Sequence, residues 1–186
     1  MILWHLGGTV ALVRYLFRDP AMDTRLLLVG ALLPDLVDKP IGRVFFRLDF
    51  DSGQIFGHTL LFSAALMVAV LIVTKRASSS RRVWMPLAIG SLVHLVLDFM
   101  WTKPETFLWP ALGDFSPAEG GNLADAFAHG LTNPWVIAGE LVGLAYLVWL
   151  WRKEGFSQGA RRRQYLSDGR LISPLGGHSS SPSQHS

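Results

Sequence analysis

Three polar residues stand inside apolar stretches in the middle of the chain. His58 lies near the start of an apolar segment over 55–74, and His94 and Asp98 lie near the end of a second one over 84–101. An ionisable side chain in a lipid-facing helix is costly unless it is paired or used, so these residues are functional candidates. Because His94 and Asp98 are four residues apart, a helix places them on one face, close enough to share a metal ion.

Two more carboxylates and a further imidazole extend this set. Asp35 and Asp38 are three residues apart beside Pro34, and His5 lies near the start of the chain. Imidazole and carboxylate donors, in a chain without cysteine, suit zinc, manganese or iron, with zinc favoured. The six residues can form one closed metal site or two open ones. Two metal ions bridged by a carboxylate are a common device for phosphoester hydrolysis, in which metal-activated water attacks.

The candidate ligands also have purely structural interpretations. Asp35 and Asp38 can cap a helix end or pair with Lys39 or Arg43. His5 can be a polar tip at a membrane interface. The spacing of these residues does not decide between the two interpretations.

Other residues are candidates for supporting roles. Asp38 can be a bridging ligand or a general base, and Arg43 or Arg47 can hold a phosphate, because a guanidinium matches its oxygens bidentately. Glu140 lies inside an apolar segment over 135–151 and can be a ligand, the partner of a histidine or part of a salt bridge. His129 is a further candidate ligand in a long loop.

The composition predicts a membrane protein. The 186 residues are 50% hydrophobic and 17% charged, with a mean hydropathy of +0.32, whereas soluble domains carry about 25% charged residues. The formal charge of +3 comes from basic residues that gather at the ends of apolar runs, as topology signals do. This placement argues against a nucleic-acid partner and for contact with membrane lipids.

The apolar segments predict an all-α, integral membrane bundle of about five helices. The first domain, 1–151, holds the metal site, and the basic, Ser/Gly/Pro-rich segment 152–186 is expected to be a largely disordered tail. The first two helices are too short for a span of about 30 Å. The predicted helices cover 1–17, 25–37, 55–74, 84–101 and 135–151, and irregular loops cover 39–56 and 102–134.

Lysine and arginine predict the orientation in a plasma (inner) membrane crossed several times. The basic turn over 75–82 and the segment 152–163, with its run Arg161–Arg163, are assigned to the cytoplasm. The starts of the first, third and fifth helices, and the ends of the second and fourth, then lie on the outer side. His5, Asp35, Asp38, His58, His94 and Asp98 all fall on that side.

Four short motifs resemble the YdjM-like family, a group of membrane-bound, metal-dependent hydrolases also named LexA-binding, inner-membrane-associated hydrolases. The similarity extends over roughly 1–150. The motifs are Gly-Ala-Leu-Leu-Pro-Asp-Leu-Val-Asp-Lys over 30–39, Gly-His-Thr-Leu-Leu over 57–61, Gly-Ser-Leu-Val-His-Leu-Val-Leu-Asp over 90–98 and Leu-Trp-Pro over 108–110.

The resemblance implies a fold distantly similar to the zinc-dependent phospholipase C and P1 nuclease group. It implies metal ligands at Asp35, His58, His94 and Asp98, with His5 and Asp38 added. The sequence departs from the family pattern at 53–59, where many members carry a His-Arg pair before Thr-His-Ser. This departure puts the metal count and the substrate in question.

These observations predict a membrane-bound metal-dependent hydrolase of a phosphoester in a lipid or lipid-linked substrate. One alternative is a carrier, which needs polar residues near mid-bilayer and accessible from both sides. The other is a regulatory or scaffold protein with a structural metal site, acting through its basic tail. Polar residues gathered towards one side favour the enzyme.

Overall fold

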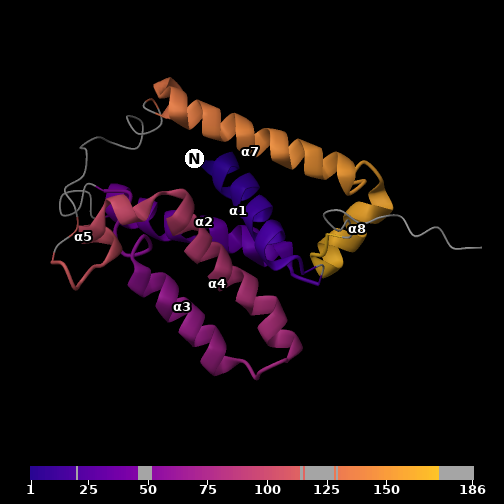
Figure 1. Ribbon diagram of the computed structural model, residues 1–186, viewed down its shortest axis with the longest axis horizontal. Helices are drawn as coiled ribbons and strands as arrows, with labels where there is room; N and C mark the ends of the chain where they lie inside the picture. The colour runs from indigo at the N-terminus through magenta and orange to yellow at the C-terminus, as the bar shows by residue number, and fades with distance from the viewer. Residues whose placement is uncertain (20, 46–51, 114, 116–127, 129, 172–186) are drawn as a thin grey trace, which may run out of the picture.

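The computed structural model describes residues 1–19, 21–45, 52–113, 115, 128 and 130–171, and within these ranges the side chain of Arg43 is not described. Every regular element in the described ranges is a helix (Figure 1). The prediction of an all-α fold is therefore confirmed. Arg47 and His129 lie outside the described residues.

The first two helices form an antiparallel pair, α1 (Ile2–Phe17) and α2 (Thr24–Pro40). Asp23 caps α2 by accepting a hydrogen bond from the backbone N–H of Arg25. Pro34 lies inside α2 and does not end it. A π-helical turn, η1 (Ile41–Phe45), continues the chain.

The central hairpin consists of α3 (Leu60–Val73) and α4 (Ser79–Leu97), with N-caps Thr59 and Ser78. His58 therefore lies in the turn before α3, and Asp98 is the C-cap of α4. The hydroxyls of Ser63 and Ser91 meet at 2.8 Å between the two helices. Such buried polar contacts tie helices together where the surroundings are apolar.

Helices α2 and α4 cross at very short range. A Cβ built on Gly30 would lie 2.0 Å from the carbonyl oxygen of Leu87, and one on Gly90 would lie 2.3 Å from that of Leu27. Only glycine allows this approach, which brings the backbone of α2 within hydrogen-bonding reach of side chains on α4. Leu27 and Ala31 are completely buried at this contact.

The segment after α4 packs against the turn that precedes α3. It contains η2 (Met100–Thr102) and α5 (Pro104–Phe107). The ring of Phe56 contacts those of Trp109 and Phe115 at centroid distances of 5.5 and 5.1 Å. This aromatic cluster holds the described part of the loop beside the ends of α2 and α4.

Helix α7 (Pro134–Lys153) lies over α1 (Figure 1). A Cβ on Gly143 would lie 2.2 Å from the carbonyl oxygen of Leu3, and one on Gly7 would lie 2.5 Å from that of Gly143. With Gly139, the helix presents a Gly-x-x-x-Gly pattern, a common basis for close helix packing in membranes. Within the described residues, only α7 is long and apolar enough to cross a membrane, by length and composition.

Part of the segment predicted to be disordered after 151 is helical. Helix α8 (Gly159–Asp168) folds back so that the hydroxyl of Thr24 donates to the carbonyl oxygen of Gly169 at 2.7 Å. Arg161 pairs with the buried carboxylate of Glu154 at 3.0 Å. This arginine is thus part of the packing, whereas its neighbours in the basic run are exposed, and residues 172–186 lie outside the described residues.

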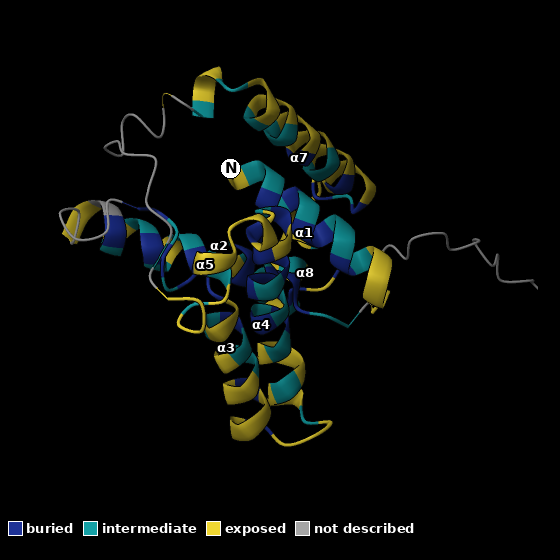
Figure 2. Ribbon diagram, turned by 60° about the vertical axis from the view of Figure 1, so that its left-hand side comes forward, coloured by how far each residue is buried: buried dark blue, intermediate teal, exposed yellow. Residues whose placement is uncertain are grey.

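Many residues along α7, α3 and the lower part of α4 are exposed (Figure 2), and large apolar side chains are among them. Large apolar side chains such as Ile72, Val73 and Trp135 are more than three-quarters exposed. Exposed apolar surface on this scale is typical of contact with lipid or another apolar partner. α1 and α3 are apolar but shorter than α7.

Candidate metal centre

Five candidate ligands from three helices and a turn meet at one end of the helices. His5 comes from α1, Asp35 from α2, His58 from the turn before α3, and His94 and Asp98 from the end of α4. Their donor atoms form two groups that share His94: one contains His5 and Asp98, the other Asp35 and His58. Within each group the atoms lie within 4.8 Å of one another, as an ion would require.

The distances within the cluster are short. His58 Nε2 lies 3.2 Å from His94 Nε2, 3.4 Å from Asp98 Oδ2 and 3.6 Å from Asp35 Oδ1. His5 Nε2 lies 2.9 Å from Asp98 Oδ1, and its ring stacks on that of His94 with centroids 4.2 Å apart. Three imidazoles and two carboxylates therefore surround one small volume.

Each histidine is oriented through its other ring nitrogen. His94 Nδ1 donates to the carbonyl oxygen of Ala31 at 2.6 Å, and His58 Nδ1 donates to Asp38 Oδ2 at 2.6 Å. His5 Nδ1 contacts the carbonyl oxygen of Met1. Since these partners are acceptors, Nδ1 carries the hydrogen in each ring, which leaves Nε2 with its lone pair facing the cluster.

This arrangement requires positive charge at the centre. Two neutral Nε2 atoms only 3.2 Å apart, on His58 and His94, would both present lone pairs, beside the oxygens of Asp35 and Asp98. His5 Nε2 is buried and has no hydrogen-bond partner of good geometry. Orientation of Nε2 by a hydrogen bond at Nδ1 is the usual pattern of metal-ligating histidines, so the donor set fits a divalent ion.

Asp38 has a different place from the other carboxylates. It is completely buried, and its oxygens accept from the backbone N–H groups of Ile55, Gly57 and His58 and from the ring of His58. It belongs to neither group of converging donor atoms. Asp38 thus fastens the turn before α3 to α2 and fixes the ring of His58.

The same contacts alter the protonation of His58 in the metal-free protein. Burial lowers the pKa of its imidazole, but hydrogen bonds with Asp38 and Asp98 outweigh burial and raise the pKa to about 9. The centre therefore takes up a proton on His58 when no metal ion is present. A metal ion and this proton compete for the same lone pair.

The centre opens on its carboxylate side. The histidine side chains are almost completely buried, whereas those of Asp35 and Asp98 are each 13% exposed. The rings form the floor, and the two carboxylates reach the surface. A ligand from outside would meet the carboxylates and their neighbours first.

Residues 1–158 match the model of a protein family that is described as "YdjM inner membrane protein". The chain belongs to this family. The match covers α1 to α7 and all five converging residues, whereas α8 follows it. Searches of curated proteins and of solved structures found no match, and the distant similarity to the phospholipase C and P1 nuclease group stays a prediction.

Of the remaining candidates of this YdjM family member, Glu140 belongs to neither group of converging donor atoms. Glu140 accepts from the backbone N–H of Leu3 at 2.9 Å, where a carboxylate stabilises the N-terminus of α1. This helix-end contact is none of the three roles that the sequence suggested for Glu140, which were ligand, partner of a histidine and salt bridge. Arg43 lies in η1, and neither its side chain nor Arg47 or His129 is described.

Two residues near the carboxylates, Gln54 and Lys103, were not among the candidates suggested by the sequence. Gln54 Nε2 donates to Asp98 Oδ2 at 3.0 Å, and Lys103 Nζ donates to Gln54 Oε1 at 2.8 Å. Gln54 stands four residues before His58, within the stretch that departs from the family pattern. That position was the one available signal, because Gln54 and Lys103 are 49 residues apart and meet only in the fold.

Proposed function

We propose that this YdjM family member is a membrane-bound, metal-dependent hydrolase of phosphoesters. The observation that supports it best is the set of three buried histidines, His5, His58 and His94. Each is oriented through Nδ1, and each presents Nε2 beside the two carboxylates. A structural hydrogen-bonded pair would not need three lone pairs aimed at one volume.

The ligands divide into two sets around the shared His94. His5 and Asp98 would hold an ion on one side, and Asp35 and His58 on the other, as a single site or as two adjacent ones. A divalent ion, zinc first among the candidates, would supply Lewis acidity towards a phosphoryl oxygen and activate water. Asp38 would hold the ring of His58 in place and act as a positioning residue.

A lipid or lipid-linked substrate suits the surroundings of the centre. The apolar residues Leu36, Phe99 and Trp101 lie within three residues of Asp35 or Asp98 in the sequence, and each is more than half exposed. Aromatic and apolar side chains at such positions are typical of a membrane interface. We propose a chain that crosses the membrane several times, with the centre at headgroup level on the outer side.

Metal content is the first test. We would purify the full chain in detergent and measure zinc, manganese and iron by elemental mass spectrometry, for wild type, His94→Ala and Asp98→Ala, with Asp19→Ala as an exposed control. We expect at least one equivalent in wild type and in Asp19→Ala, and loss of metal in both cluster variants. No metal in a folded, zinc-reconstituted wild type would overturn the proposal.

Activity separates the enzyme from the alternatives. The loaded protein would be incubated with a chromogenic aryl phosphodiester and with phospholipids in mixed micelles, and phosphate or alcohol release would be followed. We expect release that stops with chelator and in His94→Ala. Metal uptake without any release would favour a structural site in a carrier or scaffold protein.

A further inference from the structure

Each of the two carboxylates at the opening of the centre, Asp35 and Asp98, is linked to a lysine by hydrogen bonds. Lys39 Nζ donates to Asp35 Oδ2 at 2.5 Å, and Lys103 reaches Asp98 through Gln54, with distances of 2.8 and 3.0 Å. Lys103 is exposed, and the side chain of Lys39 is 41% exposed. Both ammonium groups are therefore tied to the centre and still open to a ligand from outside.

Each carboxylate faces the histidines and is also linked to one of these lysines. Asp35 Oδ1 faces His58 Nε2, while Oδ2 accepts from Lys39. Asp98 Oδ1 faces His5, while Oδ2 faces His58 and accepts from Gln54. The ammonium groups of Lys39 and Lys103 thus lie one and two hydrogen bonds, respectively, from a carboxylate that would bind an ion.

The charge at the opening depends on these lysines. With one divalent ion and neutral histidines, the carboxylates of Asp35, Asp38 and Asp98 leave one net negative charge, which would repel an anion. Lys39 and Lys103 change the balance to one net positive charge. Since phosphate monoesters carry close to two negative charges near neutral pH, the lysines decide whether such a ligand is attracted.

A simple ion-pair role explains the lysines less well. The ion pair of Lys39 with Asp35 lies at the opening, where the lysine side chain is 41% exposed, and solvent weakens a pair of this kind. Lys103 donates to the neutral amide of Gln54. An ammonium that keeps donors free beside a metal centre is instead a common partner of phosphate oxygens.

We propose that Lys39 and Lys103, the latter held by Gln54, form the phosphate-binding edge of the metal centre. The inference rests on the proposed function and names the group of the substrate that the centre recognises, the phosphate of a phosphoester. It assigns to these two lysines the task that the sequence suggested for Arg43 or Arg47.

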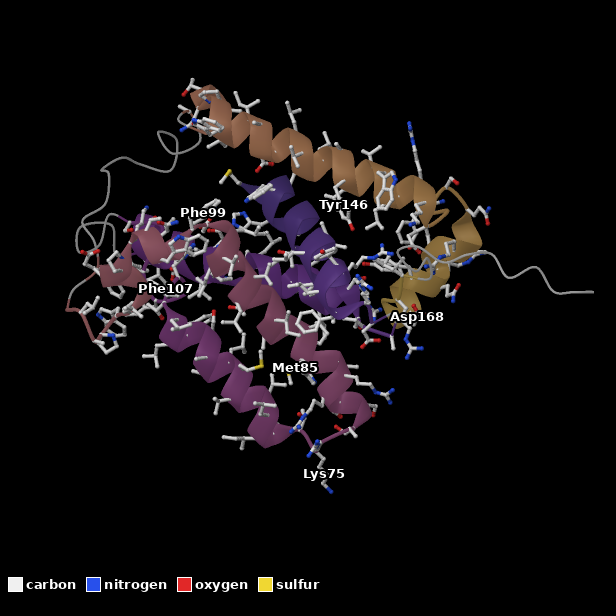
Figure 3. All side chains as sticks on the ribbon, viewed as in Figure 1. Lys75, Met85, Phe99, Phe107, Tyr146 and Asp168 are labelled. Carbon is white, nitrogen blue, oxygen red and sulfur yellow. The ribbon has the colours of Figure 1, made fainter. Side chains whose placement is uncertain are left out.

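The test measures binding without turnover. Phosphate binding to the zinc-loaded, detergent-purified chain would be followed by isothermal titration calorimetry, with inorganic phosphate and with monomeric dihexanoyl phosphatidic acid as probes. Zinc affinity would be measured separately by competition with a chelating dye. The variants are Lys39→Gln with Lys103→Gln, the matching pair of arginine substitutions, and Lys75→Gln, an exposed lysine at the far end of the α3–α4 hairpin (Figure 3).

We expect the double glutamine variant to bind inorganic phosphate at least tenfold more weakly and zinc equally or more tightly, because positive charge beside the metal has been removed. The arginine pair and Lys75→Gln should bind phosphate within about threefold of wild type. Tighter binding of the lipid probe, lost in the same variant, would assign the edge to headgroups; equal binding would assign it to water-soluble phosphates.

Three results would overturn the inference. Unchanged phosphate binding would show that the lysines do not contact the anion, while the hydrolase proposal would stand. Parallel loss of zinc and phosphate would show that they only support the carboxylates. A wild type that takes up no zinc would remove both proposals, whereas lysine-dependent phosphate binding without turnover would remove only the hydrolase.

Discussion

Asp38 shows how one residue positions a candidate metal ligand, although its own oxygens lie outside both groups of converging donor atoms. Its oxygens accept three backbone hydrogen bonds from the turn and a fourth from the ring of His58. A backbone N–H needs an acceptor when it is buried, so Asp38 both stabilises the turn and sets the direction of His58 Nε2. His58 lies in the turn before α3, whereas Asp38 lies on α2. The turn needs the acceptors of Asp38, and the ring of His58 needs the hydrogen bond from its Nδ1 to Asp38.

Substitution of Asp38 by asparagine tests both roles, the orientation of His58 and the stabilisation of the turn. The amide can accept from His58 Nδ1 with one oxygen but cannot accept from Gly57 with its nitrogen. We expect zinc affinity to fall about 10–100-fold, as for other residues behind a ligand, and stability to fall by about 1–3 kcal/mol. Dye competition and chemical denaturation would measure the two effects, with Asp19→Asn as the exposed control. Wild-type zinc affinity in Asp38→Asn would contradict this role.

The raised pKa of His58 predicts a pH-dependent metal affinity. The metal-free ring keeps a proton on Nε2 up to about pH 9, and only the unprotonated ring binds an ion. Below pH 9 each unit of pH should therefore raise the apparent zinc affinity about tenfold through His58 alone, and the rise should level off above the pKa. Zinc titrations between pH 6 and 10 would test this. An affinity independent of pH from 7 to 9 would exclude His58 as a ligand.

At the scale of elements, glycines set the distances on which the centre depends. The α2–α4 crossing at Gly30 and Gly90 is what allows His94 to reach the carbonyl oxygen of Ala31. The α1–α7 crossing at Gly7 and Gly143 seats α1, which bears His5, beneath α7. The candidate metal ligands are thus positioned by backbone contacts that larger residues would prevent.

Two glycines one turn apart on α7 offer a matched test. A methyl group at Gly143 would lie 2.2 Å from a backbone oxygen of α1, whereas at Gly139 its nearest neighbour is 3.6 Å away. Gly143→Ala should therefore lose about 1–3 kcal/mol of stability through overpacking, and Gly139→Ala should lose none. Thermal unfolding in detergent would measure both. Equal melting temperatures for the two variants would argue against this helix crossing.

Helix α8 closes the opposite end of the molecule from the metal centre. Phe99 at the end of α4 and Asp168 at the end of α8 lie far apart in Figure 3. Glu154 is fully buried between Arg161 and Arg14, at 3.0 and 3.6 Å. A buried carboxylate needs such partners, so the first arginine of the basic run is committed to packing.

On the scale of the whole molecule, the two ends differ in chemistry. The metal centre lies at one end of the helices, and the basic turn of the hairpin and α8 lie towards the other (Figure 1). Lysine and arginine gather on the cytoplasmic side of membrane proteins. This polarity favours an outward-facing centre and a cytoplasmic α8.

The absence of cysteine makes the orientation directly testable. We expect an impermeant maleimide to label Thr102→Cys in intact spheroplasts and Ser157→Cys only after lysis, because both positions are exposed but on opposite sides of the proposed membrane. The cysteine-free wild type is the control for background. If only Ser157→Cys were labelled in intact spheroplasts, the orientation would be the reverse of the one proposed. If Thr102→Cys and Ser157→Cys were both labelled, the two positions would lie on the same side of the membrane.

The helical class and the residues whose donor atoms converge follow largely from the amino-acid sequence. Apolar runs, caps such as Asp23 and the four-residue spacing of His94 and Asp98 are local properties, so they survive without knowledge of the fold. Alternation of helix direction was enough to predict that His5, Asp35 and His58 share one side. The Gly-x-x-x-Gly pattern of α7 was equally readable in the sequence and was overlooked.

The different positions of these residues in the centre become apparent from the packing of the helices. Asp35 and Asp38 are neighbours on the same helix surface, so spacing alone cannot tell which faces the histidines; the turn over 55–58 folds onto Asp38 and leaves Asp35 at the opening. The contact of Lys103 with Gln54 and the docking of α8 likewise join distant parts of the chain. Such contacts depend on the packing of several helices at once, and no local pattern encodes them.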